Sequence, residues 1–551
     1  ATLLWRSVFG DLSFAIGGGG SIRIRVHWRA NPDLEAARGR MNELHEEYIK
    51  RILSARVYDV SKETRLHDAP LLSARLGNRV LLKREDEQMI FSFKCRGAFN
   101  RIHKLVERER AGGRTVAGVI AASAGNHAQG VALAADRLKI TAVIVMPVTT
   151  PPIKVDAVRR LGGEAILFGD DFDTALAHAV ALGEERGLAF IHPFDAPDTI
   201  AGQGTVAVEL CRQHPDALDV VFVPIGGGGL AAGICAYLKY LRPEVRIVGV
   251  EPVDAASMHG ALAAGERVCL PSVGLFADGV AVRQVGEFTY ALCKDLLDEV
   301  VLVTVDEMSA AIKDMFNETR TLVEPAGALA IAGMKRWCAD SGAREQTFIA
   351  VSSGANINFD RLRHVAERAE IGESREALFA VTIPEEPGSF RTFCQSLGRR
   401  SITEFNYRYS GPDSAEVFAG VEIAGGREGR ERVLTSLHDA GFEVLDMTDN
   451  DTAKLHVRHM IGGHARLAGE RLYRFRFPER PGALLDFLTR IGKRGNISLF
   501  HYRNHGAAYG RVLVGLQLEG LDESAVAAFV DELGFHGEEV SNDAACQLFL
   551  G

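Results

Sequence analysis

The sequence predicts an α/β fold for the first two thirds of the chain and two smaller α+β modules for the rest. Between residues 79 and 360, short β-branched runs alternate with longer helical stretches. Beyond residue 375 the chain repeats itself at a spacing of 94 to 95 residues. Nearly continuous apolar strands separated by helices are typical of parallel strands covered on both faces. We therefore expect open parallel sheets with right-handed crossovers, followed by the repeated modules.

Seven apolar runs in this first region are predicted strands, and the segments 173–182 and 230–241 are predicted helices between them. The runs are rich in Val, Ile, Leu and Phe, as expected of strands buried on both faces. They lie at residues 80–82, 115–121, 141–146, 220–224, 246–250, 300–305 and 348–351.

The repeat in the tail is visible in two phrases. Pro384-Glu-Glu-Pro-Gly recurs as Pro478-Glu-Arg-Pro-Gly, and the segment 402–408 recurs as 497–503. Each copy predicts a strand, a Pro-Gly turn, an amphipathic helix, a strand, a turn, a strand and a second helix. Because two copies do not make a solenoid, we interpret the tail as a pair of regulatory or assembly modules.

Composition excludes several classes of function. The 551 residues are 47% hydrophobic and 25% charged, with 63 Lys and Arg against 72 Asp and Glu. A net charge of −9 argues against a general nucleic-acid or membrane-surface role, because both need basic surface. No apolar run approaches the roughly 18 residues of a spanning helix. The eight scattered cysteines form no C-x-x-C motif, which favours a reducing compartment and no metal finger.

The first 40 residues differ from the rest. Four arginines and one aspartate stand in residues 1–32, and four glycines follow one another at 17–20. We predict an N-terminal extension, 1–40, without ordered structure, and Met41 is a plausible native start. An Arg-biased, acid-poor leader is also typical of an organelle transit peptide. The expected location is therefore the cytoplasm, with a plastid or mitochondrion as the alternative.

Lys94 is the first candidate for chemistry. It stands in Ser92-Phe-Lys-Cys-Arg-Gly-Ala98, an apolar stretch that begins a predicted helix. Burial disfavours the charged form of a lysine, and a neutral amine is what Schiff-base chemistry needs. The structural alternative is a lysine that extends from a core helix towards water.

A second polar segment directly follows a predicted strand. It reads Ser123-Ala-Gly125-Asn126-His127. Small residues let a backbone approach a ligand closely, and the hydroxyl and amide side chains suit a carboxylate or an aromatic oxygen. A turn with a helix N-cap is the structural alternative.

Four glycines, Gly226, Gly227, Gly228 and Gly229, precede Leu230 between a predicted strand and a predicted helix. Bare N–H groups at a helix start form a cup for a phosphate monoester. The pattern Gly226-x-Gly228-x-x-Ala231 also fits a dinucleotide fingerprint loosely. That interpretation leaves the other segments unexplained, so we expect a phosphate cup.

A fourth segment, Ser352-Ser353-Gly-Ala-Asn356, follows the strand at 348–351. Ligands of open α/β sheets bind at the carboxyl ends of strands. Alone, this segment only places polar side chains at such an end.

In this order and spacing, the four segments resemble the pyridoxal-phosphate enzymes of the tryptophan-synthase-β type, in the threonine/serine dehydratase group. The resemblance implies fold type II, with two open parallel-sheet subdomains in a catalytic domain at 41–372. The tail resembles the two ACT-like domains of biosynthetic threonine deaminases, which implies regulatory domains at 373–447 and 470–551. Phe475-x-Phe-Pro-Glu-x-Pro-Gly-Ala-Leu484 and the segment 496–503 carry this resemblance.

The resemblance also implies roles for the residues of the four segments. Lys94 would hold the cofactor and act as the catalytic base, and Asn126 would contact the cofactor ring oxygen. Ser353 would face the pyridine nitrogen. The phosphate would lie against Gly226, Gly227, Gly228, Gly229 and Leu230, and the substrate against Ser123, Gly125, Asn126 and His127.

The implied reaction is deamination of L-threonine to 2-oxobutanoate and ammonia, the first committed step of isoleucine biosynthesis. Ala124 stands where serine racemases carry a serine, which disfavours racemisation. Two alternatives stay open: a broader serine/threonine dehydratase, and a non-catalytic homologue that senses amino acids. A monovalent cation at Glu251 and Asp278 is a further possibility, and acids with a structural role at strand ends are its alternative. No other metal is expected.

Regulation is implied by the same resemblance. The enzyme would be a homotetramer. Isoleucine would inhibit it, and valine would activate it. In the second module, Pro481 and Gly482 would present N–H groups to an effector carboxylate. Leu484, Leu485 and Phe487 would line an apolar pocket for its side chain, although packing within the module's own core is the alternative.

Overall fold

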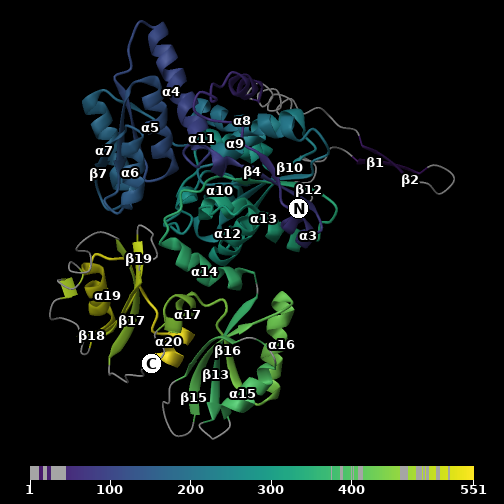
Figure 1. The fold of residues 1–551 in the computed structure, drawn as a ribbon, viewed down its shortest axis with the longest axis vertical. Helices are drawn as coiled ribbons and strands as arrows, with labels where there is room; N and C mark the ends of the chain where they lie inside the picture. The colour runs from purple at the N-terminus through teal and green to yellow at the C-terminus, as the bar shows by residue number, and fades with distance from the viewer. Residues whose placement is uncertain are drawn as a thin grey trace.

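The protein consists of an α/β region followed by two smaller α+β modules (Figure 1). The computed structural model describes residues 12–16, 22–26, 45–373, 375–384, 389–398, 400, 402–407, 414–459, 469–478, 487, 490–491, 496–503, 509–518 and 522–550. In these ranges no helix has both the length and the apolar character that a bilayer crossing demands.

The larger sheet of the α/β region has six strands in the order β11-β10-β9-β12-β4-β3. Its neighbours are parallel except for β3, which runs antiparallel to β4 at the edge. The strands are β3 (Leu66–Asp68), β4 (Arg79–Arg84), β9 (Val220–Pro224), β10 (Arg246–Pro252), β11 (Glu299–Val303) and β12 (Thr347–Ser352).

The smaller sheet has four parallel strands in the order β7-β6-β5-β8. It is formed by the chain between β4 and β9, so it is an insertion between two strands of the larger sheet that lie on either side of β12. The strands are β5 (Gly118–Ala122), β6 (Thr141–Met146), β7 (Glu164–Leu167) and β8 (Ala189–Phe190).

Helices connect these strands, as parallel pairing requires. The helices are a segment at 45–53, α3 (Pro70–Leu76), α4 (Lys94–Ala111), α5 (Asn126–Leu138), α6 (Pro152–Arg160), α7 (Phe172–Arg186), α8 (Pro197–Gln213), α9 (Gly229–Leu241), α10 (Ser257–Ala264), α11 (Glu287–Leu296), α12 (Val305–Thr319), α13 (Pro325–Ser341) and α14 (Arg361–Gly372).

All seven predicted strands exist, and the predicted helices correspond to α7 and α9. The prediction of two open parallel sheets is confirmed. The strands β3, β7 and β8 are not among the predicted ones. These strands are two to four residues long and have no fully buried residue, so they lack the continuous apolar run that marks the others.

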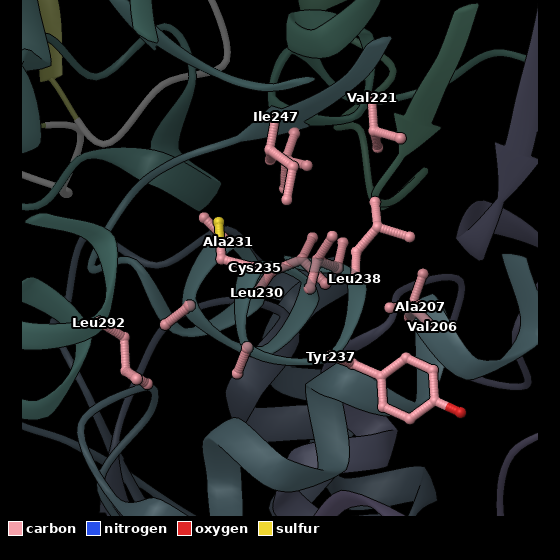
Figure 2. Close-up of a cluster of buried hydrophobic side chains, with 14 of the residues drawn as sticks. Val206, Ala207, Val221, Leu230, Ala231, Cys235, Tyr237, Leu238, Ile247 and Leu292 are labelled. Carbon is pink, nitrogen blue, oxygen red and sulfur yellow. The ribbon is translucent and has the colours of Figure 1, made fainter. Parts of the chain in front are cut away.

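The core forms two layers, one on each face of the larger sheet. Along β9, Val221 and Val223 pack into the layer that contains α8, α9 and α11, while Val220 and Phe222 pack into the layer that contains α12 and α13. Figure 2 shows side chains of α9 between sheet residues and those of neighbouring helices. Because both faces are buried, every residue of β9 is apolar.

The two modules share one topology. Their sheet orders, β14-β15-β13-β16 and β18-β19-β17-β20, correspond strand for strand. The first contains β13 (Glu376–Pro384), α15 (Ser389–Leu397), β14 (Ile402–Tyr407), β15 (Ser414–Glu422), α16 (Gly426–Asp439) and β16 (Glu443–Asp446), followed by α17 (Asp451–Leu455). The second contains β17 (Glu470–Pro478), β18 (Asn496–Arg503), β19 (Tyr509–Gln517), α19 (Glu523–Glu532), β20 (Gly537–Glu539) and α20 (Ala544–Phe549).

The N-terminal extension contains an antiparallel hairpin of β1 (Leu12–Ile16) and β2 (Ile22–Val26). These two strands depart from the prediction of an extension without ordered structure. Alternating residues explain them, because Ile22, Ile24 and Val26 are separated by arginines. The boundaries of the domains stay predictions.

A buried ion network joins α4 to the larger sheet and to α8. The Arg96 guanidinium donates to both carboxylate oxygens of Glu85 and of Glu209, at 2.6–2.9 Å. Lys83 donates to Glu209 at 2.6 Å. None of the four side chains is exposed. Although burial alone would raise it, Arg96 and Lys83 hold the pKa of Glu85 below its usual range.

Removing one charge from this network should destabilise the fold strongly. Glu209→Gln leaves Arg96 and Lys83 with one buried carboxylate between them, and breaking a buried pair costs about 3–5 kcal/mol. The urea midpoint of unfolding, followed by circular dichroism, should fall well below that of the wild type. Glu63→Gln, which removes the partially exposed Glu63–Arg212 pair, is the matched control and should cost about 1 kcal/mol or less. Equal shifts for the two variants would contradict a dominant role for the network.

Candidate active site

Lys94 is the first residue of α4, and its side chain is held at the junction of the two sheets. Its Nζ donates to the carbonyl oxygen of Pro193 at 3.1 Å. Burial lowers the pKa of Lys94 to about 8, with Glu324 opposing the shift. The N–H of Phe93 donates to the carbonyl oxygen of Ser353 at 3.2 Å. The helix start with Lys94 and the turn with Ser353 therefore lie side by side.

Asn126, the first residue of α5, is fixed by two side chains, those of Glu324 at the N-cap of α13 and Asn356 after β12. Its Nδ2 donates to Glu324 at 2.6 Å, and its Oδ1 accepts from Asn356 at 2.6 Å. Burial raises the pKa of Glu324 to about 7, and Asp278 adds to the shift. Asn356 also donates to the carbonyl oxygen of Ile90. The second and fourth segments thus meet through side-chain hydrogen bonds.

Among the remaining residues of the second segment, Gly125 borders open space and His127 is buried. A Cβ at Gly125 would meet no protein atom within 4 Å. Ser123 accepts a hydrogen bond from the N–H of Gly125 at 3.3 Å. His127 is buried against the carbonyl oxygen of Ile191, at 2.9 Å from Nε2. Burial, with Lys94 adding to it, lowers the pKa of His127 to about 3, so its ring is neutral.

The four-glycine loop lies between β9 and α9, as predicted. In the part of the chain that the structure describes, the N–H groups of Gly226, Gly227, Gly228 and Gly229 donate to no protein acceptor. The carbonyl of Gly227 accepts from Thr289 Oγ1 at 2.6 Å and from the N–H of Gly286, which fixes the loop. Gly228 has φ +93°, a conformation that favours glycine.

The segment 191–195, which the sequence analysis did not single out, connects the other parts. Pro193 accepts from Lys94, and the ring of Phe194 lies where a Cβ at Gly227 would stand. Asp195 accepts from the N–H groups of Glu287 and Phe288 at the start of α11. All these contacts are distant in sequence, so no local pattern marks the segment.

Ser353 is buried, and its Oγ donates to the carbonyl oxygen of Ala326 at 3.1 Å. The adjacent Ser352 Oγ is buried without a hydrogen-bond partner among the described residues. The carboxyl end of β12 therefore carries two buried hydroxyl groups at the predicted place, of which that of Ser353 is bonded to Ala326.

Glu251 and Asp278, the acids of the possible monovalent-cation site, each have partners within the protein. Glu251 accepts from the N–H groups of Met258 and His259 at the start of α10, each at 2.8 Å. Asp278 pairs with Lys154 and Arg361, which hold its pKa below the usual range although burial opposes them. Both acids serve the fold, which favours the structural interpretation. Among the described residues, no three His, Cys, Asp or Glu side chains gather as around a metal ion.

The predicted effector residues in the second module are only partly within the structure. Pro481, Gly482, Leu484 and Leu485 lie outside the described residues. Phe487 is fully buried and packs against Phe475, Phe477 and Phe535. It belongs to the core of the module, so its expected place in an effector pocket is not supported.

The donor set fits pyridoxal phosphate. The structure brings three features together: the desolvated amine of Lys94, the unpaired N–H groups of the glycine loop and the polar turn after β12. The contacts of residues 191–195 and of Asn126 connect them. The amine suits a covalent link to an aldehyde, and the cup suits a phosphate.

Comparisons with known proteins agree with this arrangement. Residues 57–354 match the family of pyridoxal-phosphate dependent enzymes. Residues 367–457 and 462–550 match the C-terminal regulatory domain of threonine dehydratase.

Similar proteins share most of the chain. The chain is 54% identical to the biosynthetic L-threonine dehydratase IlvA of Burkholderia multivorans, over 92% of this chain and 99% of that protein. It is 50% identical to the Escherichia coli protein of that name, over 92% and 97%. The structure of the processed form of threonine deaminase isoform 2 from Solanum lycopersicum is 47% identical, with a TM-score of 0.57, over 66% of this chain and 93% of that chain.

The sequence match extends through both the catalytic region and the tail, and the residues of the site have the chemistry that the cofactor needs. The chain belongs to the family of biosynthetic threonine dehydratases, pyridoxal-phosphate enzymes with a C-terminal regulatory domain.

Proposed function

We propose that this protein deaminates L-threonine to 2-oxobutanoate and ammonia, the first committed step of isoleucine biosynthesis. One observation carries the proposal. The desolvated amine of Lys94 donates to Pro193, and the ring of the next residue, Phe194, contacts the glycine loop. Among the described residues, the N–H groups of this loop have no protein acceptor. The names of the relatives supply the substrate, since they are threonine dehydratases.

Four elements would hold the cofactor. Lys94 would provide the covalent link, and the N–H groups from Gly226 to Leu230 would bind the phosphate. Asn126, whose amide is fixed by Glu324 and Asn356, would contact the ring oxygen. Ser353 would face the ring nitrogen, and its hydroxyl would turn from Ala326 to donate there. When bound, the cofactor supplies an electron sink for the substrate's α-carbon.

Lys94 is the proposed base that removes the α-proton. With a pKa of about 8, a small but useful fraction of the free amine is neutral at pH 7, and its conjugate acid is still strong enough to return a proton. Glu324 is close enough to act on the Lys94 amine electrostatically. Because the pKa of Glu324 is about 7, much of this carboxyl group is protonated at pH 7. A weakly charged partner leaves the amine neutral more often than a full carboxylate would.

The start of α5 is the proposed site of the substrate carboxylate. Ser123, Gly125, Asn126 and His127 lie there, and the space beside Gly125 is free of protein atoms. N–H groups at a helix start attract an anion. Because His127 is neutral, it adds no charge and helps to shape the site through its contact with Ile191.

The tail is proposed to carry feedback control, with isoleucine as inhibitor and valine as the opposing activator. The match to a regulatory domain of threonine dehydratase supports effector binding. The first module is tied to the catalytic region by Lys454 of α17, which donates to Asp306 of α12 at 2.7 Å. We also propose a homotetramer. The proposed location is the cytoplasm, or a plastid or mitochondrion if residues 1–40 act as a transit peptide.

Lys94→Ala tests the catalytic assignment. The variant should lose the borohydride-trappable link to pyridoxal phosphate and at least 1,000-fold in threonine turnover, roughly what loss of a nucleophile or base costs. The measurement is 2-oxobutanoate release, with peptide mapping of the reduced link. Lys104→Ala, on the same helix and paired with Glu107 near the surface, is the control and should keep both. A trapped cofactor in the Lys94→Ala enzyme would refute the assignment.

Feedback control is tested in the same assay on the full-length holoenzyme. Isoleucine should lower the rate at subsaturating threonine, and added valine should restore it, because the two ligands favour different conformations. Serine in place of threonine measures the breadth of the substrate range. An unchanged rate across isoleucine concentrations would refute the feedback proposal and leave the catalytic one standing.

A further inference from the structure

His192 follows the end of β8, at the edge of the smaller sheet where the proposed substrate site lies. The N–H of Ile191 donates to the carbonyl oxygen of Ile120 at 2.9 Å, so the pairing of β8 with β5 extends to the residue before His192. The strand β5 ends at Ala122 and leads into the segment with Asn126. Because the carboxyl ends of parallel strands meet at one edge of a sheet, where ligands of open α/β sheets bind, His192 borders this edge.

Two backbone N–H groups fix the imidazole ring of His192. The N–H of Asp195 donates to Nδ1 at 2.8 Å, and the N–H of Phe194 donates to the same atom at 3.4 Å. A ring nitrogen that accepts carries no proton, so these contacts assign the proton of the neutral ring to Nε2. The ring of Phe194 also packs edge-on against His192, with 4.7 Å between the centroids. The ring is therefore held with an N–H donor on its opposite side.

The ring of His192 is mainly neutral at pH 7. Desolvation lowers its pKa, Asp195 opposes the shift and Lys94 adds to it. His192 in turn contributes to the lowered pKa of His127. The three groups are thus within electrostatic range of one another, and His192 offers a hydrogen-bond donor without bringing a second positive charge to Lys94.

The Nε2–H group of His192 has no acceptor among the described residues. The side chain is partly exposed, and Nε2 is not enclosed by protein atoms, so it borders open space. His127 differs, because it is buried and its Nε2 lies 2.9 Å from the carbonyl oxygen of Ile191. A ring that is fixed through one nitrogen and unpartnered at the other is oriented for a ligand.

The position of His192 in the segment 191–195 indicates which ligand group it meets. The residue before it, Ile191, contacts His127 at the proposed carboxylate site. The residue after it, Pro193, accepts from the Lys94 amine. The start of α5 is the proposed site of the carboxylate, and the glycine loop that of the cofactor phosphate. The polar group of threonine that still lacks a donor is the β-hydroxyl, which leaves in the reaction.

We propose that His192 is a catalytic residue that donates a hydrogen bond from Nε2 to the β-hydroxyl oxygen of the substrate as this group leaves. The inference rests on the proposed deamination of threonine. The Cα–H and Cβ–O bonds break, a Cα=Cβ double bond forms, and the electron pair of the Cβ–O bond stays on the oxygen. The proton that Lys94 removes is the one that this oxygen gains, so water leaves and His192 keeps its own proton. The hydrogen bond stabilises the negative charge that develops on the oxygen.

β-Chloro-L-alanine separates this role from a role in folding or cofactor binding. Its leaving group is chloride, which departs without a proton and is a weak hydrogen-bond acceptor. It otherwise matches L-serine, whose leaving group is a hydroxyl, so the same base and the same carboxylate site act on both. A defect confined to the hydroxyl substrates therefore reports on the leaving group.

The test variant is the His192→Asn holoenzyme. An asparagine Oδ1 can still accept from the N–H of Asp195, while no donor reaches the place of Nε2. The kcat for threonine and for serine should fall about 100-fold, the usual loss for one donor at a developing oxyanion. The kcat for β-chloro-L-alanine should change less than about 3-fold, because chloride needs no such donor. His192→Gln, whose side-chain amide can donate near the original place, should recover part of the rate on threonine.

His178→Asn is the matched control. His178 is a partly exposed histidine on α7 of the same half of the catalytic region, and its ring stacks on Phe168 with 3.8 Å between the centroids. This variant should keep the wild-type rate on all three substrates. The readout is the initial rate of 2-oxoacid release, with bound cofactor measured by absorbance.

Two results would overturn the proposal: equal losses on serine and β-chloro-L-alanine in His192→Asn, or unchanged rates on threonine and serine. Equal losses would indicate that His192 serves the fold, the cofactor or the carboxylate site. Failure of the proposed function gives a different result. A wild-type enzyme that deaminates serine but not threonine would refute the threonine assignment, and serine would then decide the role of His192. A wild-type enzyme that acts on β-chloro-L-alanine alone would refute both.

Discussion

The network of Lys83, Glu85, Arg96 and Glu209 is the constraint on which the active site depends. Two positive and two negative charges are enclosed without solvent, and their hydrogen bonds join β4, the start of α4 and α8. Desolvating four charges is costly unless each is paired with good geometry, so the elements can pack in few other ways. Lys94 is two residues from Arg96, and its position follows from this arrangement.

The same helix start places Lys94 where its amine loses solvent. One backbone carbonyl, that of Pro193, accepts from it, and burial lowers its pKa. The glycine loop, the start of α5 and the end of β12 meet around it through hydrogen bonds between segments distant in sequence. The fold thus brings an amine, an anion cup and polar side chains together, while the chemistry of elimination comes from the cofactor.

Sequence patterns predicted the buried strands and the four segments of the site, because both leave local signals. Consecutive apolar residues mark β9 and β12, and glycines between a strand and a helix mark the loop at 226–229. The short strand β8 and the contacts of residues 191–195 leave no local signal in the sequence. Glu209 and Arg96 are 113 residues apart, and nothing near either indicates that they pair.

The pH dependence of cofactor binding by Lys94 tests the account most directly. In cofactor-free enzyme, the rate at which added pyridoxal phosphate forms the borohydride-trappable link should follow the neutral fraction of the Lys94 amine. Because burial lowers that pKa, the rate should rise with pH and level off with a midpoint near 8. A midpoint near 10.5, the value of a solvated lysine, would contradict a desolvated amine held by the start of α4.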